Sequence, residues 1–250
     1  MYPTRPRSAL RTAVVWEVVR AGLEQRVAEL GRPVLEVLDT GGGTGNFAVP
    51  VARLGHRVTV VDPSPDALFA LERRAAEAGV TELVRAVQGD TQTLPELVTP
   101  GTVDAVLCHG VLEMVDDPAE ALGNLTATLA KGGLVSLLAA NRNGAVLARA
   151  LAGHFADARA VLDAPDGRWG AQDPMPRRFS VEELGELAAA AGLEVTSVHG
   201  VRVFADLVPG VLVDTEPGAM EALLKLEQAA AEQPAFHAVA TQLHVLAALV

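Results

Sequence analysis

Apolar residues near the start of the chain recur at intervals of three and four positions, the spacing of one face of an α-helix. They are Leu10, Val14, Val15, Val18, Val19, Leu23 and Val27. Gly31 and Pro33 then interrupt the pattern, as residues that follow a helix commonly do. We therefore expect residues 1–32 to form an N-terminal helical segment.

Beyond this segment, short runs rich in valine and leucine alternate with stretches of helical character. The predicted strands are Val34–Asp39, Arg57–Asp62, Val84–Gln88, Val103–Cys108 and Leu134–Ala140, and the predicted helices lie near 45–54, 65–78, 91–98 and 117–130. Because the runs are apolar almost throughout, they suit strands that are covered on both faces. The pattern predicts an α/β fold, in which right-handed crossovers build a mostly parallel sheet with helices on both faces.

The alternation is lost between residues 141 and 179, where glycine, proline, arginine and aromatic residues are mixed. We interpret this stretch as an insertion between the fifth strand and the next helix. The elements expected after it are the helices Val181–Ala191 and Pro217–Ala231 and the strands Leu193–Phe204 and Gln242–Leu249. The seven strands fit a single domain over residues 1–250, with the parts 1–32, 33–140, 141–179 and 180–250.

Composition narrows the class of protein. The chain has 250 residues, a formal net charge of −11 and 50% hydrophobic residues, which suits an acidic, soluble, folded protein and not a disordered one. Its one cysteine, Cys108, allows no internal disulfide and no thiolate cluster, so we assign no metal site. The longest apolar run, Leu134–Ala140, interrupted only by Ser136, is far shorter than the roughly 20 residues that cross a bilayer. We expect a cytoplasmic protein with no signal peptide and no membrane partner.

The most informative stretch joins the first predicted strand to the helix after it through a glycine-rich turn, with the sequence VLDTGGGTGNF over residues 37–47. Such a turn presents backbone N–H groups, unobstructed by side chains, to a ligand. Asn46 stands where a dinucleotide-binding loop usually needs a glycine, which disfavours a nicotinamide-dependent dehydrogenase. A tight turn with a purely structural role is the alternative.

Two acids end the next two strands. Asp62 lies seventeen residues after Gly45 at the end of the second strand, where an acid can accept hydrogen bonds from both hydroxyls of a ribose. Asp90 follows the third strand, where it can accept a hydrogen bond from the exocyclic amine of an adenine. Each could instead cap a helix, although Ser64 is better placed than Asp62 for that role.

Taken in order, these motifs resemble those of the class I S-adenosylmethionine-dependent methyltransferases over about residues 34–140. The stretches VDAVLCHGVLEMVDDP and AKGGLVSLL are similar to later motifs of that family. The resemblance implies S-adenosylmethionine as the cofactor and a Rossmann-like sheet whose last strand is antiparallel. It also implies that residues 1–32 cap the cofactor, that 33–140 bind it, and that the insertion 141–179 covers the substrate.

A narrower resemblance runs nearly end to end. The segments LRTAVVWEVV, GVRVFADLV and EALLKLEQ are similar to those of the bacterial tRNA carboxymethoxyuridine carboxyl-methyltransferases, which methylate an acid on a modified wobble uridine. A guanidinium at Arg11 suits the methionine carboxylate of the cofactor, because the two can form parallel hydrogen bonds. The cofactor-binding residues expected from both resemblances are Arg11, Asp39, Gly41, Gly42, Gly43, Gly45, Asp62, Asp90, Thr91 and His109.

A carboxylate acceptor is already ionised at pH 7, so its methylation needs positioning and no general base. We therefore assign no catalytic residue. Cations would bind the acid, and we favour Arg202, whose flanks match the family best, together with Arg142 and Arg178. The predicted acceptor is an acid in the tRNA anticodon loop. A small carboxylic acid, an O-methyltransferase reaction on a small acidic metabolite, and a non-catalytic cofactor-binding module stay open as alternatives.

Overall fold

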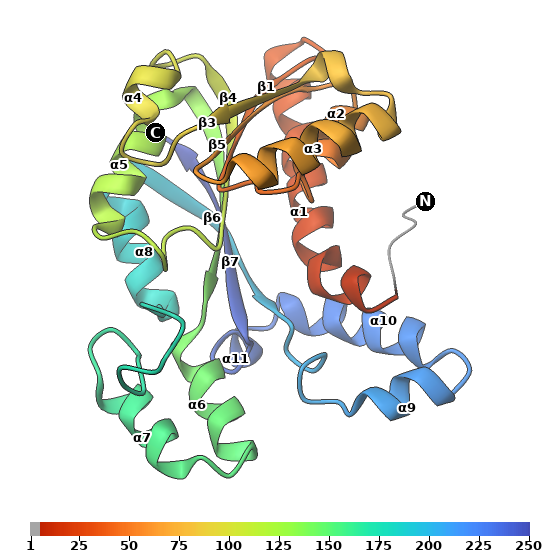
Figure 1. Ribbon diagram of the computed structural model, residues 1–250, viewed down its shortest axis with the longest axis vertical. Helices are drawn as coiled ribbons and strands as arrows, with labels where there is room; N and C mark the ends of the chain where they lie inside the picture. Colours follow the sequence, from red (N-terminus) through yellow and green to blue (C-terminus); the bar gives the residue numbers. More distant parts are fainter. Residues whose placement is uncertain (1–5) are drawn as a thin grey trace. The chain divides into compact units, whose positions relative to one another are not determined.

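The computed structural model describes residues 6–250, with side chains at all of these positions except 6–11, 214 and 215 (Figure 1). The strands are β1 (Glu36–Thr40), β2 (Arg57–Asp62), β3 (Val84–Gln88), β4 (Val103–His109), β5 (Leu129–Ala140), β6 (Leu193–Val201) and β7 (Gln242–Leu249). The helices are α1 (Pro6–Leu30), α2 (Ala48–Arg53), α3 (Pro65–Ala78), α4 (Leu94–Leu97), α5 (Pro118–Thr128), α6 (Arg142–Leu151), α7 (Phe155–Asp163), α8 (Val181–Ala190), α9 (Gly210–Thr215), α10 (Ala219–Ala231) and α11 (Pro234–His237), with a 3-10 turn at Thr81–Leu83.

The seven strands form one sheet in the order β3-β2-β1-β4-β5-β7-β6, mostly parallel with the last strand antiparallel, which confirms the predicted fold class. Strand β1 pairs in parallel with β2 and with β4, so that Thr40 lies opposite Val61 on one side and Cys108 on the other. Because these strands end at the same level, the residues that follow them gather at one edge of the sheet.

The described residues form two compact units. The first unit comprises residues 19–137, 186–196 and 246–250 and contains β1 to β4; the second comprises residues 6–18, 138–185 and 197–245. The single-domain division expected at residues 33, 141 and 180 stays a prediction. Each unit is described below by itself.

In the first unit, the inner strand β4 has the burial that its composition predicts, whereas the edge strand β3 has no buried residue. All the residues of β4 from Val103 to Cys108 are buried, as expected for a strand covered on both faces. Figure 1 shows α2 and α3 on one side of these strands and α4 and α5 on the other. Helix α3 begins as predicted, because the Ser64 hydroxyl accepts a hydrogen bond from the N–H of Ala67 at 3.3 Å.

The long helix α1 follows the predicted apolar face. Val15, Val19 and Leu23 are almost fully buried, and the helix ends before Gly31, whose φ of 63° suits glycine. At 25 residues it is long enough to be considered as a membrane span, but no described helix, α1 included, is both long and apolar enough for one.

The second unit departs most from the predicted pattern. The insertion, where the alternating pattern is lost, contains α6 and α7, which were not predicted, and α9 and α11 were also missed. Helices α6 and α7 are short, at ten and nine residues, and only Gly144 of α6 and Ala158 and Val161 of α7 are buried, so little of their sequence pattern reflects a packed core. Helix α6 instead begins at Asn141, whose side chain accepts a hydrogen bond from the N–H of Asn143 at 3.1 Å and donates one to the carbonyl of Ala240 at 2.8 Å.

Candidate functional site

The glycine-rich turn after β1 is tied to the neighbouring strand by backbone hydrogen bonds. The N–H of Gly41 donates to the carbonyl of Val61 at 2.7 Å, and the N–H of Gly43 donates to Oδ2 of Asp62 at 2.9 Å. Both contacts lie within the first unit, at the carboxyl edge of β1 and β2. The turn is therefore held in one conformation by β2.

Two of its glycines are required by close packing. A Cβ atom at Gly42 would lie 2.6 Å from the carboxyl group of Asp39, and one at Gly45 would lie 2.3 Å from Cδ1 of Leu71 in α3. Gly45 also has a φ of +80°, which other residues rarely adopt. Asn46, the departure from a dinucleotide loop, is exposed, and its Oδ1 accepts a hydrogen bond from Arg74 at 2.9 Å. The backbone of the turn, which has no side chain at Gly42, therefore lies close to the carboxyl group of Asp39.

Asp39, the last-but-one residue of β1, is an unusual carboxyl group. It is 2% exposed, and its Oδ2 has no hydrogen-bond partner among the described residues. Burial raises the pKa of Asp39 to about 7; a backbone hydrogen bond from Ala48 opposes this shift and the nearby charge of Asp62 adds to it. Asp39 is therefore close to its titration point at neutral pH, and a cation beside it would favour the ionised form.

Asp62 is the last residue of β2, and each of its two carboxylate oxygens accepts one backbone hydrogen bond. Oδ1 accepts a hydrogen bond from the N–H of Ser64 and Oδ2 accepts one from Gly43, each at 2.9 Å. A carboxylate oxygen can accept two hydrogen bonds, so each oxygen retains capacity for a further donor. Since Ser64 caps α3, the role of helix cap that was considered for Asp62 does not apply.

Asp90 and Thr91 follow β3. The exposed Asp90 carboxylate accepts hydrogen bonds from the N–H groups of Gln92 and Thr93, both at 3.0 Å, and these bonds hold its pKa below the ordinary value. Thr91 is buried, and its carbonyl accepts a hydrogen bond from Asn124 at 3.0 Å. Asp90 therefore caps the turn at residues 90–93 and not helix α4, whose N-cap residue is Thr93, and its contact with an adenine stays a prediction.

Cys108 and His109 are the last two residues of β4, and burial changes the pKa values of both side chains. The Nε2 of His109 lies 2.8 Å from the Ser136 hydroxyl, and its ring packs edge-on against Phe47. Burial lowers the pKa of His109 to about 3, so the ring is neutral at physiological pH. Burial, with the charges of Glu113 and Asp39, raises the pKa of the Cys108 thiol well above its ordinary value. Neither residue is suited to act as an acid or a nucleophile near neutral pH.

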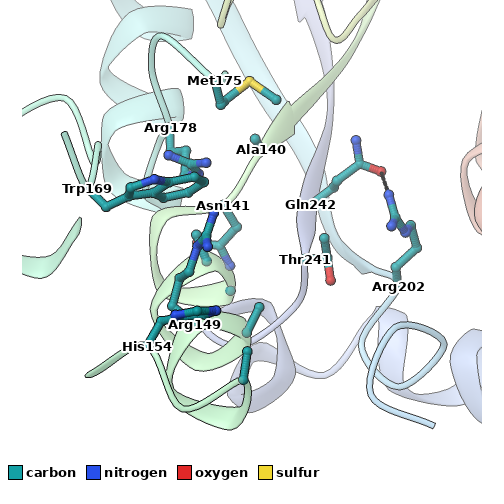
Figure 2. Close-up of a pocket in the computed structure, with 14 residues that line it drawn as sticks. Ala140, Asn141, Arg149, His154, Trp169, Met175, Arg178, Arg202, Thr241 and Gln242 are labelled. Carbon is teal, nitrogen blue, oxygen red and sulfur yellow. Dashed lines mark hydrogen bonds between the residues drawn. The ribbon is translucent and has the colours of Figure 1, made fainter. Parts of the chain in front are cut away.

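The second unit contains a cavity of about 460 Å³ (Figure 2). Its walls come from α6, the loop before Phe179, the end of β6 and the start of β7, and they include Arg149, His154, Trp169, Met175, Arg178 and Arg202. None of its fourteen lining residues is acidic. The cavity therefore exposes guanidinium groups and no carboxylate to a ligand.

The arginines predicted for substrate binding lie in different settings. Arg178 and Arg202 line the cavity, whereas Arg142 does not and instead contacts the carbonyl of Pro165 and the carboxylate of Glu183, both at 2.7 Å. Arg202 has a φ of +59° and pairs with Asp206 at 2.5 Å. The prediction that Arg11 contacts the cofactor concerns a side chain outside the described residues.

The Arg178 guanidinium is buried against a carboxylate that the sequence did not single out. Its two terminal nitrogens contact the two oxygens of Asp173 at 2.6 and 3.0 Å, and one of them also donates to the carbonyl of Gly167 at 2.7 Å. Burial alone would raise the pKa of Asp173, but hydrogen bonds from Arg178, Met175 and Trp169 hold it below the ordinary value. The pair fixes the loop that forms one wall of the cavity.

Two further residues were missed. Glu227 of α10 is fully buried, and its carboxylate accepts hydrogen bonds from the N–H groups of Val203, Phe204 and Ala205 at 2.6 to 2.9 Å. Nothing local in the sequence marks this contact. Arg149 could have been found once α6 was recognised, because the spacing of Ala145, Ala148, Arg149 and Ala152 places all four on one helix face.

Comparison with known proteins adds to this geometry. Residues 15–198 match a family described as a methyltransferase domain. The chain is 31% identical over 246 residues to the tRNA 5-carboxymethoxyuridine methyltransferase of Escherichia coli, covering 96% of this chain and 88% of that protein. It is 35% identical over 176 residues to a ubiquinone biosynthesis O-methyltransferase of Methylocella silvestris, covering 67% of this chain and 61% of that protein.

Among solved structures, an S-adenosylmethionine-dependent methyltransferase from Methanosarcina mazei matches with a TM-score of 0.60, over 88% of this chain and 94% of that one. The two sequences are only 16% identical, so this likeness concerns the fold alone. The shared fold is the Rossmann-like one predicted from the alternating strands and helices.

Proposed function

Because this chain belongs to the class I S-adenosylmethionine-dependent methyltransferases, we propose that it methylates a carboxylate oxygen and that its acceptor is the carboxymethoxyuridine of a tRNA anticodon loop. One observation carries the proposal. The similarity to the Escherichia coli tRNA enzyme extends over 96% of the chain and so includes the second unit, with its arginine-lined cavity, as well as the glycine turn.

The cofactor of this family supplies a methyl group carried on a positively charged sulfur. The residues at the carboxyl edge of the first unit fit the rest of that molecule. The retained acceptor capacity of Asp62 suits ribose hydroxyls, and the buried Oδ2 of Asp39, without a partner among the described residues, suits the methionine ammonium. The bare backbone at Gly42 allows close approach. These residues, with the other predicted members of the set, would hold the cofactor.

The acceptor chemistry agrees with the absence of a suitable base at the end of β4. A carboxylate is ionised at pH 7 and attacks the methyl group without losing a proton, so the enzyme needs to position the acid and balance its charge. Burial lowers the pKa of His109 to about 3, which makes its neutral ring a weak base, and Cys108 is protonated. The cavity, with three arginines and no acid in its walls, is the part of the structure suited to the acceptor carboxylate.

A second candidate function is methylation of a small molecule, either a carboxylic acid or the oxygen of a small acidic metabolite. The similarity to the ubiquinone biosynthesis O-methyltransferase favours it, at 35% identity over 176 residues. The net charge of −11 favours it as well, since RNA-binding surfaces are usually basic.

The tRNA reaction would take place in the cytoplasm.

The proposed function is tested by methyl transfer from labelled S-adenosylmethionine to tRNA that carries free carboxymethoxyuridine, with small carboxylic acids in parallel. We expect an ester on the modified nucleoside and a yield that falls as the salt concentration rises, because phosphate contacts are screened. Transfer to a small acid alone would replace the tRNA proposal with the second candidate. Transfer to none of these acceptors would contradict the tRNA proposal and methylation of a small carboxylic acid, and would leave an oxygen of a small acidic metabolite as the acceptor to test.

Asp62→Ala is expected to weaken cofactor binding by about 1 to 3 kcal/mol, because the ribose hydroxyls lose their acceptors. Isothermal titration with S-adenosylmethionine measures the change, and the melting temperature shows whether the turn has kept its structure. Asp66→Ala is the matched control, since Asp66 is exposed in the first turn of α3. Equal affinities of the two variants would remove Asp62 from the cofactor site.

A further inference from the structure

The three arginines of the cavity differ in how far their charge is already neutralised. Arg178 pairs with both oxygens of Asp173, and Arg202 pairs with Asp206 at 2.5 Å. The Arg149 guanidinium makes no hydrogen bond to any described residue, and its one ion pair among them, with Asp157, spans 3.7 Å. Arg149 is therefore the lining cation with the most hydrogen-bonding capacity left for a ligand.

Arg149 is also held in place by a contact that leaves its N–H donors available for hydrogen bonds to a ligand. Its guanidinium carbon lies 3.4 Å from the centre of the Trp169 ring, a close cation–π contact. A guanidinium stacked on an aromatic face keeps its N–H groups in its own plane, so they remain available to a carboxylate. The contact reduces the side-chain entropy that Arg149 would otherwise lose when it binds a ligand.

Trp169 is fixed in turn by the buried pair behind it. Its backbone N–H donates to Oδ2 of Asp173 at 3.2 Å, and the Arg178 guanidinium carbon lies 4.6 Å from the centre of its ring. Figure 2 shows Arg178 and Arg149 on opposite sides of the ring. Both faces of Trp169 are therefore occupied, which leaves no face on which a nucleic acid base could stack.

Space for a ligand lies beside Arg149 because its neighbours on α6 are small. Gly144, Ala145, Ala148 and Ala152 line the cavity from the same helix. A Cβ atom at Gly144 would lie 2.2 Å from the carbonyl oxygen of Ala240, so the helix packs closely against that segment. The small side chains leave the guanidinium accessible from the cavity.

We propose that Arg149 is the residue that binds the acceptor carboxylate, and that Trp169 is its positioning residue. The inference rests on the proposed function, in which a carboxylate accepts the methyl group. In the reaction, a carboxylate oxygen forms a bond to the methyl carbon while the methyl–sulfur bond breaks, and the electron pair of that bond returns to sulfur. The sulfonium becomes a neutral thioether, the acid becomes a neutral ester, and no proton moves. Arg149 thus binds the charged acid more strongly than the ester, which favours product release.

The test compares Arg149→Gln with Arg159→Gln, an exposed arginine of α7 that pairs with Asp163 outside the cavity. The acceptor is an anticodon stem-loop with carboxymethoxyuridine, and a second stem-loop carries the corresponding carboxamide as a competitive ligand. We expect Arg149→Gln to raise KM for the acid about tenfold or more, with unchanged cofactor affinity. We expect it to abolish the preference of the protein for the acid over the amide, and Arg149→Lys to recover part of that preference.

Trp169→Leu is expected to raise KM as well, whereas Trp169→Phe retains a ring and should lie closer to the wild type. A role for Trp169 in stability alone would lower the melting temperature of Trp169→Leu and leave KM unchanged, and that result would overturn its positioning role. If the wild type is active and Arg149→Gln keeps the KM of Arg159→Gln, the Arg149 assignment is wrong and the proposed function stands. If the wild type methylates neither the stem-loop nor small acids, the proposed function fails and the Arg149 assignment fails with it.

Discussion

Replacing Asp173 with alanine is expected to destabilise the protein by about 3 to 5 kcal/mol, the usual cost of removing one partner from a buried ion pair. Arg178 is 7% exposed and Asp173 is 6% exposed, so the guanidinium left behind would stay buried without its counter-charge. The N–H groups of Trp169 and Met175 would also lose the acceptor that the Asp173 carboxylate provides. The substitution therefore leaves a buried charge unpaired and also removes hydrogen bonds that hold the loop of the cavity wall.

Denaturant unfolding measures this effect, and Asp163→Ala is its control. Asp163 also pairs with an arginine, Arg159, but both side chains are exposed on α7, so the control should show little change. Adding Arg178→Met to Asp173→Ala should recover part of the lost stability, since the double variant buries no unpaired charge. A loss no greater than that of Asp163→Ala would show that Arg178 reaches solvent when its partner is removed.

Glu227→Ala is expected to cost about 3 kcal/mol or more, because three backbone N–H groups lose one shared acceptor and each buried unsatisfied donor costs about 1 to 3 kcal/mol. The three groups belong to residues 203–205, directly after Arg202. Arg202 has a φ of +59°, an unfavourable conformation for arginine that the surrounding structure must stabilise. Loss of the carboxylate should therefore loosen the segment that carries this cavity arginine.

Chemical denaturation of Glu227→Ala, Glu227→Gln and Glu221→Ala separates these contributions. The glutamine variant keeps one carbonyl acceptor and should be intermediate. Glu221 is exposed on the same helix and pairs with the exposed Lys225, so its removal should change stability little. Hydrogen exchange at residues 203–205 gives a local readout. Unchanged exchange in Glu227→Ala would contradict the role assigned to this carboxylate.

The fold could be predicted because its main signals are local. Strand β4 is buried along its length, so its composition alone distinguishes it, and Ser64 marks the start of α3 within a few residues. Strand β5 is different. It begins at Leu129, ahead of the predicted Leu134, because sheet formation extends it through Gly132 and Gly133, which taken locally indicate a turn. The helix expected near 91–98 is only α4, since Asp90 and Thr93 form a capped turn before it.

The candidate site divides in the same way. The glycine turn and Asp62 lie within one strand–turn–helix unit and its neighbour, so spacing was enough to select them. Arg149 was missed because α6 was missed, and Glu227 because its partners lie more than twenty residues away in the sequence. Arg142 shows the limit of a basic stretch as a signal, since it pairs with Glu183 and does not line the cavity, and its role in substrate binding stays a prediction. Sequence indicates charge, but only packing shows which charges are already neutralised.

The burial of Cys108 has a practical consequence for labelling. It is the only cysteine of the chain, 1% exposed, and its thiol is protonated at the pH of ordinary maleimide or iodoacetamide reactions. The native protein should therefore react with neither reagent, and a cysteine introduced at exposed Ala152, on the rim of the cavity, should be the only residue modified. A single fluorophore at that position would report occupancy of the cavity directly, without relying on turnover.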